Sequence, residues 1–139
     1  MIIAVDFDGT IVDHVFPEIG DLVPGALETL KEFSSRGYTL ILWTMRSGKY
    51  LDDATNFCKR HGIKIVFANH NPGDRKWTDS PKVYANVYID DAALGCPLKK
   101  NPRMGGRPYV DWELVRAKFY RLASYDLNMD PKVVSQNKD

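Results

Sequence analysis

The chain has few cysteines, no long apolar run and almost no net charge. Cys58 and Cys96 are the only cysteines among 139 residues, and their spacing fits neither a metal site nor a disulfide framework, so we expect reduced thiols. No apolar stretch approaches the length of a membrane span. A net charge of +1 gives no argument for a polyanionic partner. These features argue against a disulfide-rich secreted domain, a membrane protein and a strongly basic nucleic-acid binder.

The length and the N-terminal residues predict one domain in the cytoplasm. The first apolar run begins at Ile2, which leaves no room for a targeting segment before folded structure starts. A chain of 139 residues can bury a sizeable core without disulfides or structural metal. We predict a domain over residues 1–123 and a C-terminal extension over 124–139 that is disordered in part. The sequence leaves the oligomeric state open.

The first ten residues carry the most informative pattern. Ile2 to Val5 form a short apolar run, which predicts a strand buried on both faces. Asp6 and Asp8 follow, and two residues of extended chain place both carboxylates on the same side. They repel each other unless one is protonated or a cation lies between them. Gly9 and Thr10 then form a tight turn whose backbone can approach a ligand; the alternative is a plain turn with solvated acids.

Strands and helices alternate along the rest of the sequence. Apolar runs and helical spacing predict strands over 39–43, 63–68 and 87–89 and helices over 24–36, 47–61 and 111–122. Right-handed crossovers then imply a parallel sheet covered on both faces. We therefore predict a three-layer, Rossmann-like, doubly wound α/β domain.

Polar residues follow three of these strands. Asp6 and Asp8 follow the first strand, Thr44 the second, and Asp90 with Asp91 the fourth. The carboxyl ends of parallel strands meet at one edge of the sheet, where such folds bind their ligands. Carboxylates without a softer ligand favour Mg²⁺, above all where phosphate is bound. We predict a Mg²⁺ site that involves Asp6, Asp8, Asp90 and Asp91.

Such a site permits phosphoryl transfer to a carboxylate. One carboxylate can attack phosphorus, and a second one two residues on can protonate the leaving oxygen and later activate water. Thr44 offers a hydroxyl and a backbone donor to a phosphate oxygen. Lys82 offers a positive charge in the loop before the fourth strand.

The motif Asp6-Phe7-Asp8-Gly9-Thr10, followed by Thr44, Lys82 and Asp90-Asp91, resembles the four ordered motifs of the haloacid dehalogenase superfamily of phosphohydrolases. The resemblance spans Met1 to about Leu94. It implies that Asp6 is the nucleophile that forms an aspartyl-phosphate, and that Asp8 is the general acid and base with its backbone carbonyl on the metal. It also implies that Thr44 and Lys82 hold the phosphoryl oxygens, and that the acidic pair completes the Mg²⁺ site.

The same resemblance implies a phosphatase without a cap domain. Members that break carbon–halogen bonds lack an acid at the position of Asp8, so hydrolysis of a phosphomonoester is the expected reaction. The family inserts caps after the first motif or between the second and third. Here residues 11–23 suffice only for a short flap, and residues 47–81 are taken by a helix, a strand and a loop. An open site suits a macromolecular phosphate, and a small phosphorylated substrate remains open as well.

Weaker signals have two interpretations each. Arg46 either reaches the substrate or is solvated, and His14 in the flap either meets a leaving group or has no role. The basic segment 99–107 binds a second phosphate or a nucleic-acid backbone, or is an exposed loop; we favour the loop, so nucleic acid is not the preferred partner. Trp77 lies in a loop where it can line a substrate cleft.

Two rival functions belong to other classes. A phosphoacceptor signalling domain also combines an acidic pocket, Mg²⁺, Thr and Lys, but it carries its phosphorylated Asp on a middle strand, whereas the third strand here ends at Ala68 and Asn69. A catalytically silent protein or subunit that only binds metal and phosphate is the second rival. Every motif residue is present, so the sequence gives no sign of lost turnover.

Overall fold

Strand β1 (Ile2–Val5) lies inside a sheet of four parallel strands. The computed structural model describes residues 1–73 and 77–125, apart from the side chain of Tyr125. The strand order is β3-β2-β1-β4, with β2 at Thr39–Leu42, β3 at Ile65–Ala68 and β4 at Val87–Ile89. Ile3 pairs with Leu40 on one side and with Val87 on the other, so β1 is hydrogen-bonded along both edges.

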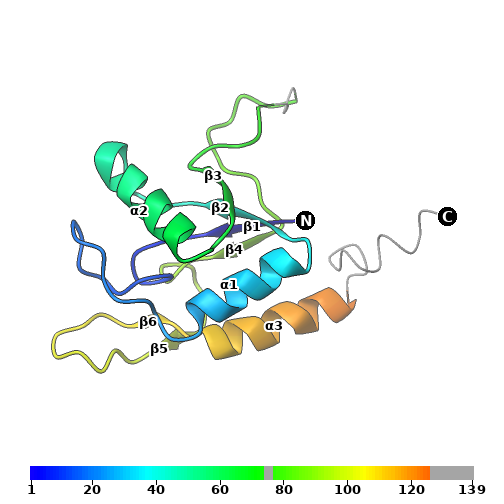
Figure 1. Ribbon diagram of the computed structural model, residues 1–139. Coiled ribbons are helices and arrows are strands. Elements are labelled where there is room, and N and C mark those ends of the chain that lie inside the picture. The colour runs from blue at the N-terminus through cyan, green and yellow to red at the C-terminus, as the bar shows by residue number, and fades with distance from the viewer. Residues whose placement is uncertain (74–76, 126–139) are drawn as a thin grey trace.

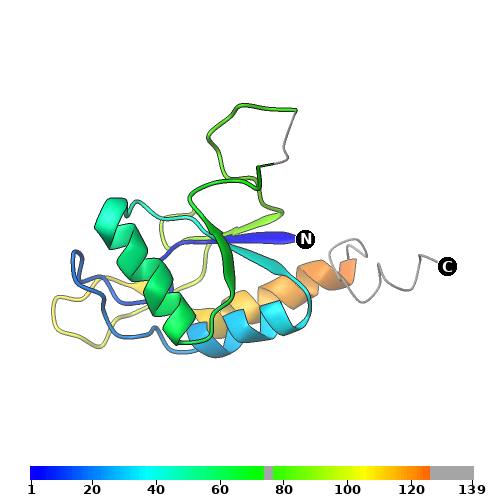
Figure 2. The ribbon, with the colours of Figure 1, turned by 45° about the horizontal axis from the view of Figure 1, so that its top comes forward.

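One face of the sheet packs against all three helices. The alternation along β1 sends Ile3 and Val5 into the same core as the buried residues of α1 (Ala26–Ser35), α2 (Gly48–Arg60) and α3 (Trp112–Tyr125). Helices α1 and α3 lie side by side below the sheet in both ribbon views (Figures 1 and 2). This core fixes the carboxyl end of β1, where the acidic residues begin.

The second face of the sheet is covered by the connection between β3 and β4. The chain must cross from one edge strand to the other in the opposite direction, so a right-handed crossover takes the connection, described at residues 69–73 and 77–86, over this face. Val83 is fully buried against Ala4 and Ile41, while the described parts of the connection form no helix. In Figures 1 and 2 this segment projects on the side away from α1 and α3.

A small ribbon of two strands follows β4. β5 (Leu98–Lys99) pairs antiparallel with β6 (Tyr109–Val110), and the amide of Val110 donates to the carbonyl of Gly9 at 3.0 Å. No periodic pattern predicts these strands, because each has two residues and the segment between them is rich in Pro and Gly. The ribbon braces the turn after β1.

The predicted helices occur with small differences at their ends. Asp111 accepts from the amide of Leu114 at 3.2 Å and so caps α3, whereas Ser47 stands before α2 without a side-chain cap bond. Near the end of α3, Leu122 is 54% exposed and Ala123 is buried.

The α/β, Rossmann-like fold class predicted from the sequence is confirmed by the parallel sheet, its order and its three flanking helices. No described helix is long and apolar enough to cross a membrane. The predicted C-terminal extension lies outside the described residues from position 126 onward.

Candidate functional site

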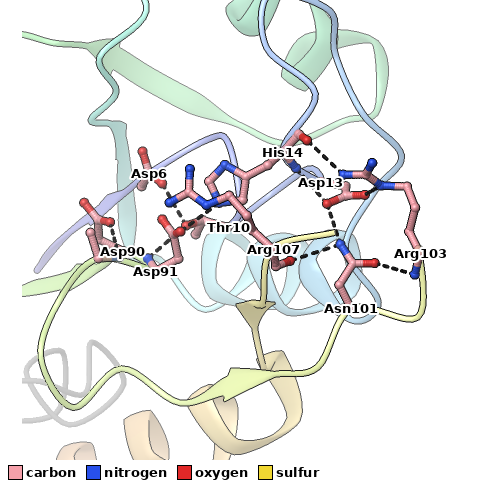
Figure 3. Close-up of polar contacts among 10 residues, drawn as sticks. Asp6, Thr10, Asp13, His14, Asp90, Asp91, Asn101, Arg103 and Arg107 are labelled. Atoms are coloured by element: carbon pink, nitrogen blue, oxygen red, sulfur yellow. Dashed lines mark hydrogen bonds and ion pairs between the residues drawn. The ribbon is translucent and has the colours of Figure 1, made fainter. Parts of the chain in front are cut away.

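Three carboxylates meet at the carboxyl edge of the sheet. Asp6 directly follows β1 and Asp90 follows β4, and the register of the two strands places them opposite each other. One oxygen from each of Asp6, Asp90 and Asp91 lies within 4.8 Å of the others. Figure 3 shows the three side chains gathered on one side of the close-up. The cluster lies where the strand order reverses between β1 and β4, the usual ligand position in such sheets.

Thr10 holds two members of the cluster in place. Its hydroxyl donates to Asp6 Oδ2 at 2.9 Å and accepts from the backbone amide of Asp91 at 3.2 Å. Its carbonyl accepts from the indole Nε1 of Trp112 at 2.7 Å. Thr10 is fully buried, so its side chain positions the acidic cluster, in contrast to our expectation that it contacts a substrate.

The electrostatics of the cluster are unfavourable without a cation. Burial, followed by the charge of Asp90, raises the pKa of Asp6 to about 8, although the hydrogen bond from Thr10 works in the opposite direction. Protonation of Asp6 or a bound cation relieves this repulsion.

His14 from the flap belongs to the same site. Its Nε2 lies 2.8 Å from Asp91 Oδ2, and both side chains are largely buried. Gly9 leaves room for the imidazole: its φ is 81°, and a Cβ there would collide with the His14 ring. In Figure 3 His14 lies between the acidic cluster and Asp13. Two interpretations of His14 were open from the sequence, and the structure places its ring on a carboxylate of the cluster.

Asp8 forms an ion pair with Arg46. Arg46 Nε donates to Asp8 Oδ2 and Nη2 donates to Asp8 Oδ1, both at 2.7 Å. This two-pronged geometry orients the Asp8 carboxylate and engages both of its oxygens. The Asp8 side chain is therefore separate from the three-carboxylate cluster, and the group that the family resemblance assigns to the metal is the backbone carbonyl of Asp8.

Arg46 also connects Asp8 to the flap. Its guanidinium donates to the carbonyls of Pro17 and Glu18 at 3.2 and 2.7 Å and lies over the ring of Phe16. Arg46 is only 3% exposed, so in this conformation it serves Asp8 and the flap and is not the solvated side chain that was one of its two interpretations. The flap itself is a short hairpin: Asp13 donates to the carbonyl of Asp21.

Thr44 lies beside the site and is held by Asn69. The Thr44 amide donates to Asn69 Oδ1 at 2.8 Å, so the backbone donor that we expected to serve a phosphate is already used. The hydroxyl accepts from the amide of Arg46 at 3.2 Å and keeps its own proton for donation. Asn69 has a φ of 57° and also donates to the carbonyl of Arg46. The sequence analysis did not find Asn69, whose role depends on a contact between two strand ends.

Lys82 lies on the second face of the sheet. Its Nζ is 5.6 Å from the centroid of the Tyr88 ring, and its side chain is exposed. Among the described residues, it makes no hydrogen bond or ion pair with the acidic cluster. The structure therefore separates Lys82 from the carboxylates with which the sequence grouped it.

The basic segment 99–107 supports the flap. Arg103 Nε donates to Asp13 Oδ2 at 2.8 Å, and Asn101 Nδ2 donates to Asp13 Oδ1 at 2.7 Å (Figure 3). Burial alone would raise the pKa of Asp13, but these hydrogen bonds and the charge of Arg103 lower it overall. Arg103 also donates to the carbonyl of His14. The segment thus fixes the base of the flap.

The donor set of the cluster suits a hard divalent cation. Asp6, Asp90 and Asp91 offer carboxylate oxygens alone, as Mg²⁺ prefers. Burial and the charge of Asp90 both disfavour the ionised form of Asp6, and a cation between the carboxylates would offset this. These three residues would hold the ion, and His14 would orient Asp91 behind it.

The fold and this edge define a Rossmann-like α/β protein with an acidic cluster at the switch point of its sheet. No family model and no curated protein matches the chain. A solved structure, described as the conserved protein coded by a locus from Bacteroides thetaiotaomicron, has 37% sequence identity, a TM-score of 0.71, and covers 87% of this chain and 90% of its own. The chain belongs to the same family as this conserved protein.

Proposed function

We propose that this protein is a Mg²⁺-dependent phosphatase of the haloacid dehalogenase superfamily that hydrolyses a phosphomonoester through an aspartyl-phosphate on Asp6. The observation that carries the proposal is the convergence of Asp6, Asp90 and Asp91 beyond β1 and β4. The order of the motif residues along the chain supports it. When bound, Mg²⁺ would neutralise the carboxylates and the phosphoryl oxygens, which allows one carboxylate to attack phosphorus.

Different residues of the chain would then carry out the steps of the reaction. An oxygen of Asp6 forms a bond to phosphorus while the bond to the leaving oxygen breaks, and Asp8 gives that oxygen a proton. Asp8 then takes a proton from the water that attacks the aspartyl-phosphate, which releases phosphate and restores Asp6. The hydroxyl of Thr44 is free to donate to a phosphoryl oxygen.

Asp8 must release part of its ion pair before it can give a proton. Both of its oxygens accept from Arg46, which also carries the flap. Movement of the flap tip with Arg46 would free Asp8 when substrate enters. In the second step, the same arginine would orient the Asp8 carboxylate toward water.

A protein that binds metal and phosphate without turnover is the second candidate. The engagement of both Asp8 oxygens and the distance of Lys82 from the cluster favour it. Such a protein would bind Mg²⁺ and phosphate but would release no phosphate from any ester.

A screen for phosphate release separates the two candidates. Wild-type protein and Asp6→Asn are incubated with Mg²⁺ and a panel of nucleotides, sugar phosphates, phosphopeptides and phosphorylated oligonucleotides. We expect release by wild type that stops on addition of EDTA and is lost in Asp6→Asn. Phosphate release by Asp6→Asn within tenfold of wild type would refute the assignment of Asp6 as the nucleophile. No phosphate release by wild type from any compound of the panel would favour the second candidate.

A further inference from the structure

A pocket on the second face of the sheet is lined in part by Tyr88, on the strand that leads to Asp90 of the acidic cluster. Tyr88 and Asp90 are two residues apart on β4 and its continuation, so they share this face at a distance of about 7 Å. Asp6 follows Ile2 and Ala4 in the alternation along β1 and therefore faces the same side. A substrate whose phosphate reached Asp6 could extend along this face.

Aromatic rings line this pocket. Its volume is about 390 Å³, the size of a site for one small molecule. Trp77 is 73% exposed and Tyr88 38% exposed, so both rings have faces open to a ligand. Lys82 Nζ lies 5.6 Å from the centroid of the Tyr88 ring and also lines the pocket. Figure 1 shows the pocket-forming connection between β3 and β4 projecting from the sheet. The pocket is completed by Asn71, Thr78, Ser80, Tyr84 and Ala85.

The polar groups of the pocket are mainly donors. The hydroxyl oxygens of Thr78 and Ser80 accept from backbone amides, so their protons remain available. The side chain of Asn71 already has two partners: its Nδ2 donates to the carbonyl of Lys82, and its Oδ1 accepts from the backbone amide of Tyr84. Among the described residues, no carboxylate lines the pocket to accept from the hydroxyls of a sugar. Donors beside open aromatic faces suit a flat ring with acceptor atoms at its edge.

We infer that this pocket binds the base of a nucleoside monophosphate whose phosphate lies at Asp6, an inference that rests on the proposed function. Trp77 and Tyr88 supply stacking surfaces, and Thr78, Ser80 and Lys82 donate to the ring edge. The substrate is thereby a mononucleotide, and the connection between β3 and β4 determines specificity.

Binding measurements on the inactive Asp6→Asn protein with Mg²⁺ test the inference without turnover. Nucleoside 5′-monophosphates are compared by calorimetry with ribose 5-phosphate, which differs by the base alone. We expect the nucleotides to bind roughly tenfold more tightly or better, the size of one base–aromatic stacking contact. Adding Trp77→Ala should abolish this difference, Trp77→Phe should keep most of it, and Leu114→Ala, at a half-exposed position on α3, should leave it unchanged.

Other results overturn the inference. Equal affinity for nucleotide and ribose 5-phosphate, or a nucleotide affinity that Trp77→Ala does not change, would show that the pocket does not bind the base. Tenfold tighter binding of a 5′-phosphorylated oligonucleotide than of the mononucleotide would show that the ligand is the end of a nucleic acid and not a mononucleotide.

The two proposals fail in different ways. Binding of nucleotide that depends on Trp77, without any phosphate release by wild type, would refute the phosphatase and keep the nucleotide pocket. Release of phosphate from ribose 5-phosphate as fast as from nucleotides, with no effect of Trp77→Ala, would keep the phosphatase and refute the pocket.

Discussion

At the scale of single residues, the site is a set of carboxylates that each have a different partner. Asp6 is held by Thr10, Asp91 by His14, and Asp90 accepts from the amide of Ala92 at 2.8 Å. One oxygen of each carboxylate lies within 4.8 Å of the others. Burial of Asp6, followed by the charge of Asp90, raises the pKa of Asp6 to about 8.

The stability of the metal-free protein should depend on pH through Asp6. The unfolded state loses this proton near pH 3.8 and the folded state near 8, so Asp6 favours unfolding increasingly as pH rises between these values, by up to about 1.4 kcal/mol per pH unit. Asp6→Asn should therefore stabilise the protein in EDTA at pH 8 and have little effect at pH 4. Urea denaturation at both pH values measures the difference, and saturating Mg²⁺ at pH 8 should reduce it. An equal effect of the substitution at pH 4 and pH 8 would contradict this account.

His14→Ala should weaken Mg²⁺ binding. The imidazole orients the Asp91 carboxylate, and loss of such a partner typically costs about 10- to 100-fold in metal affinity. Calorimetric titration with Mg²⁺ measures the change. His70→Ala is the control, because that ring bonds the carbonyl of Asn71 on an exposed loop. An unchanged Mg²⁺ affinity in His14→Ala would show that His14 does not support the ion site.

At the scale of elements, the flap is the part most dependent on tertiary contacts. Arg46 from the loop after β2 pairs with Asp8 and holds the flap at the carbonyls of Pro17 and Glu18, and Arg103 from the loop before β6 holds it at Asp13. The sequence predicted the flap as a segment too broken for a helix. It did not predict the two arginine ion pairs, because they join residues that are 38 and 90 positions apart.

Removal of Arg46 should destabilise the protein and open the flap. Arg46→Ala leaves Asp8 in a partly buried place without its counter-charge, and we expect a loss of about 3 kcal/mol in the free energy of unfolding. Hydrogen exchange should increase at the amides of Asp13 and Val23, which bond across the flap hairpin. Arg103→Ala, at a half-exposed ion pair, should cost at most about 1 kcal/mol. Equal losses for both variants would contradict the central position of Arg46.

At the scale of the whole molecule, the strand order explains why the sequence was informative about the site. Ile2–Val5 had to be a buried strand, and parallel strands bring their carboxyl ends to one edge, so the meeting of Asp6 with Asp90 and Asp91 followed from the fold class. The way in which the second face of the sheet is covered could not be predicted from the fold class. A crossover of the length of 69–86 usually contains a helix, and here Val83 and the loop take its place.

The same reasoning accounts for the residues that were placed differently. Lys82 and Arg46 were assigned by their position after or before a strand, which says nothing about the direction of a long side chain. Their actual partners, Tyr88 and Asp8, come from other elements.

The most direct test of the account is the capture of phosphate on Asp6. Asp8→Asn is mixed with Mg²⁺ and acetyl phosphate, whose leaving group needs no proton, so formation of the aspartyl-phosphate should proceed while its hydrolysis is slowed. After an acid quench, intact-mass spectrometry should show the addition of one phosphoryl group. The peptide that contains Asp6 should carry this group, and the addition should disappear in EDTA and in the Asp6→Asn, Asp8→Asn double variant. Consumption of acetyl phosphate with no phosphorylated protein, or a phosphoryl group on another residue, would contradict the assignment of Asp6 as the nucleophile.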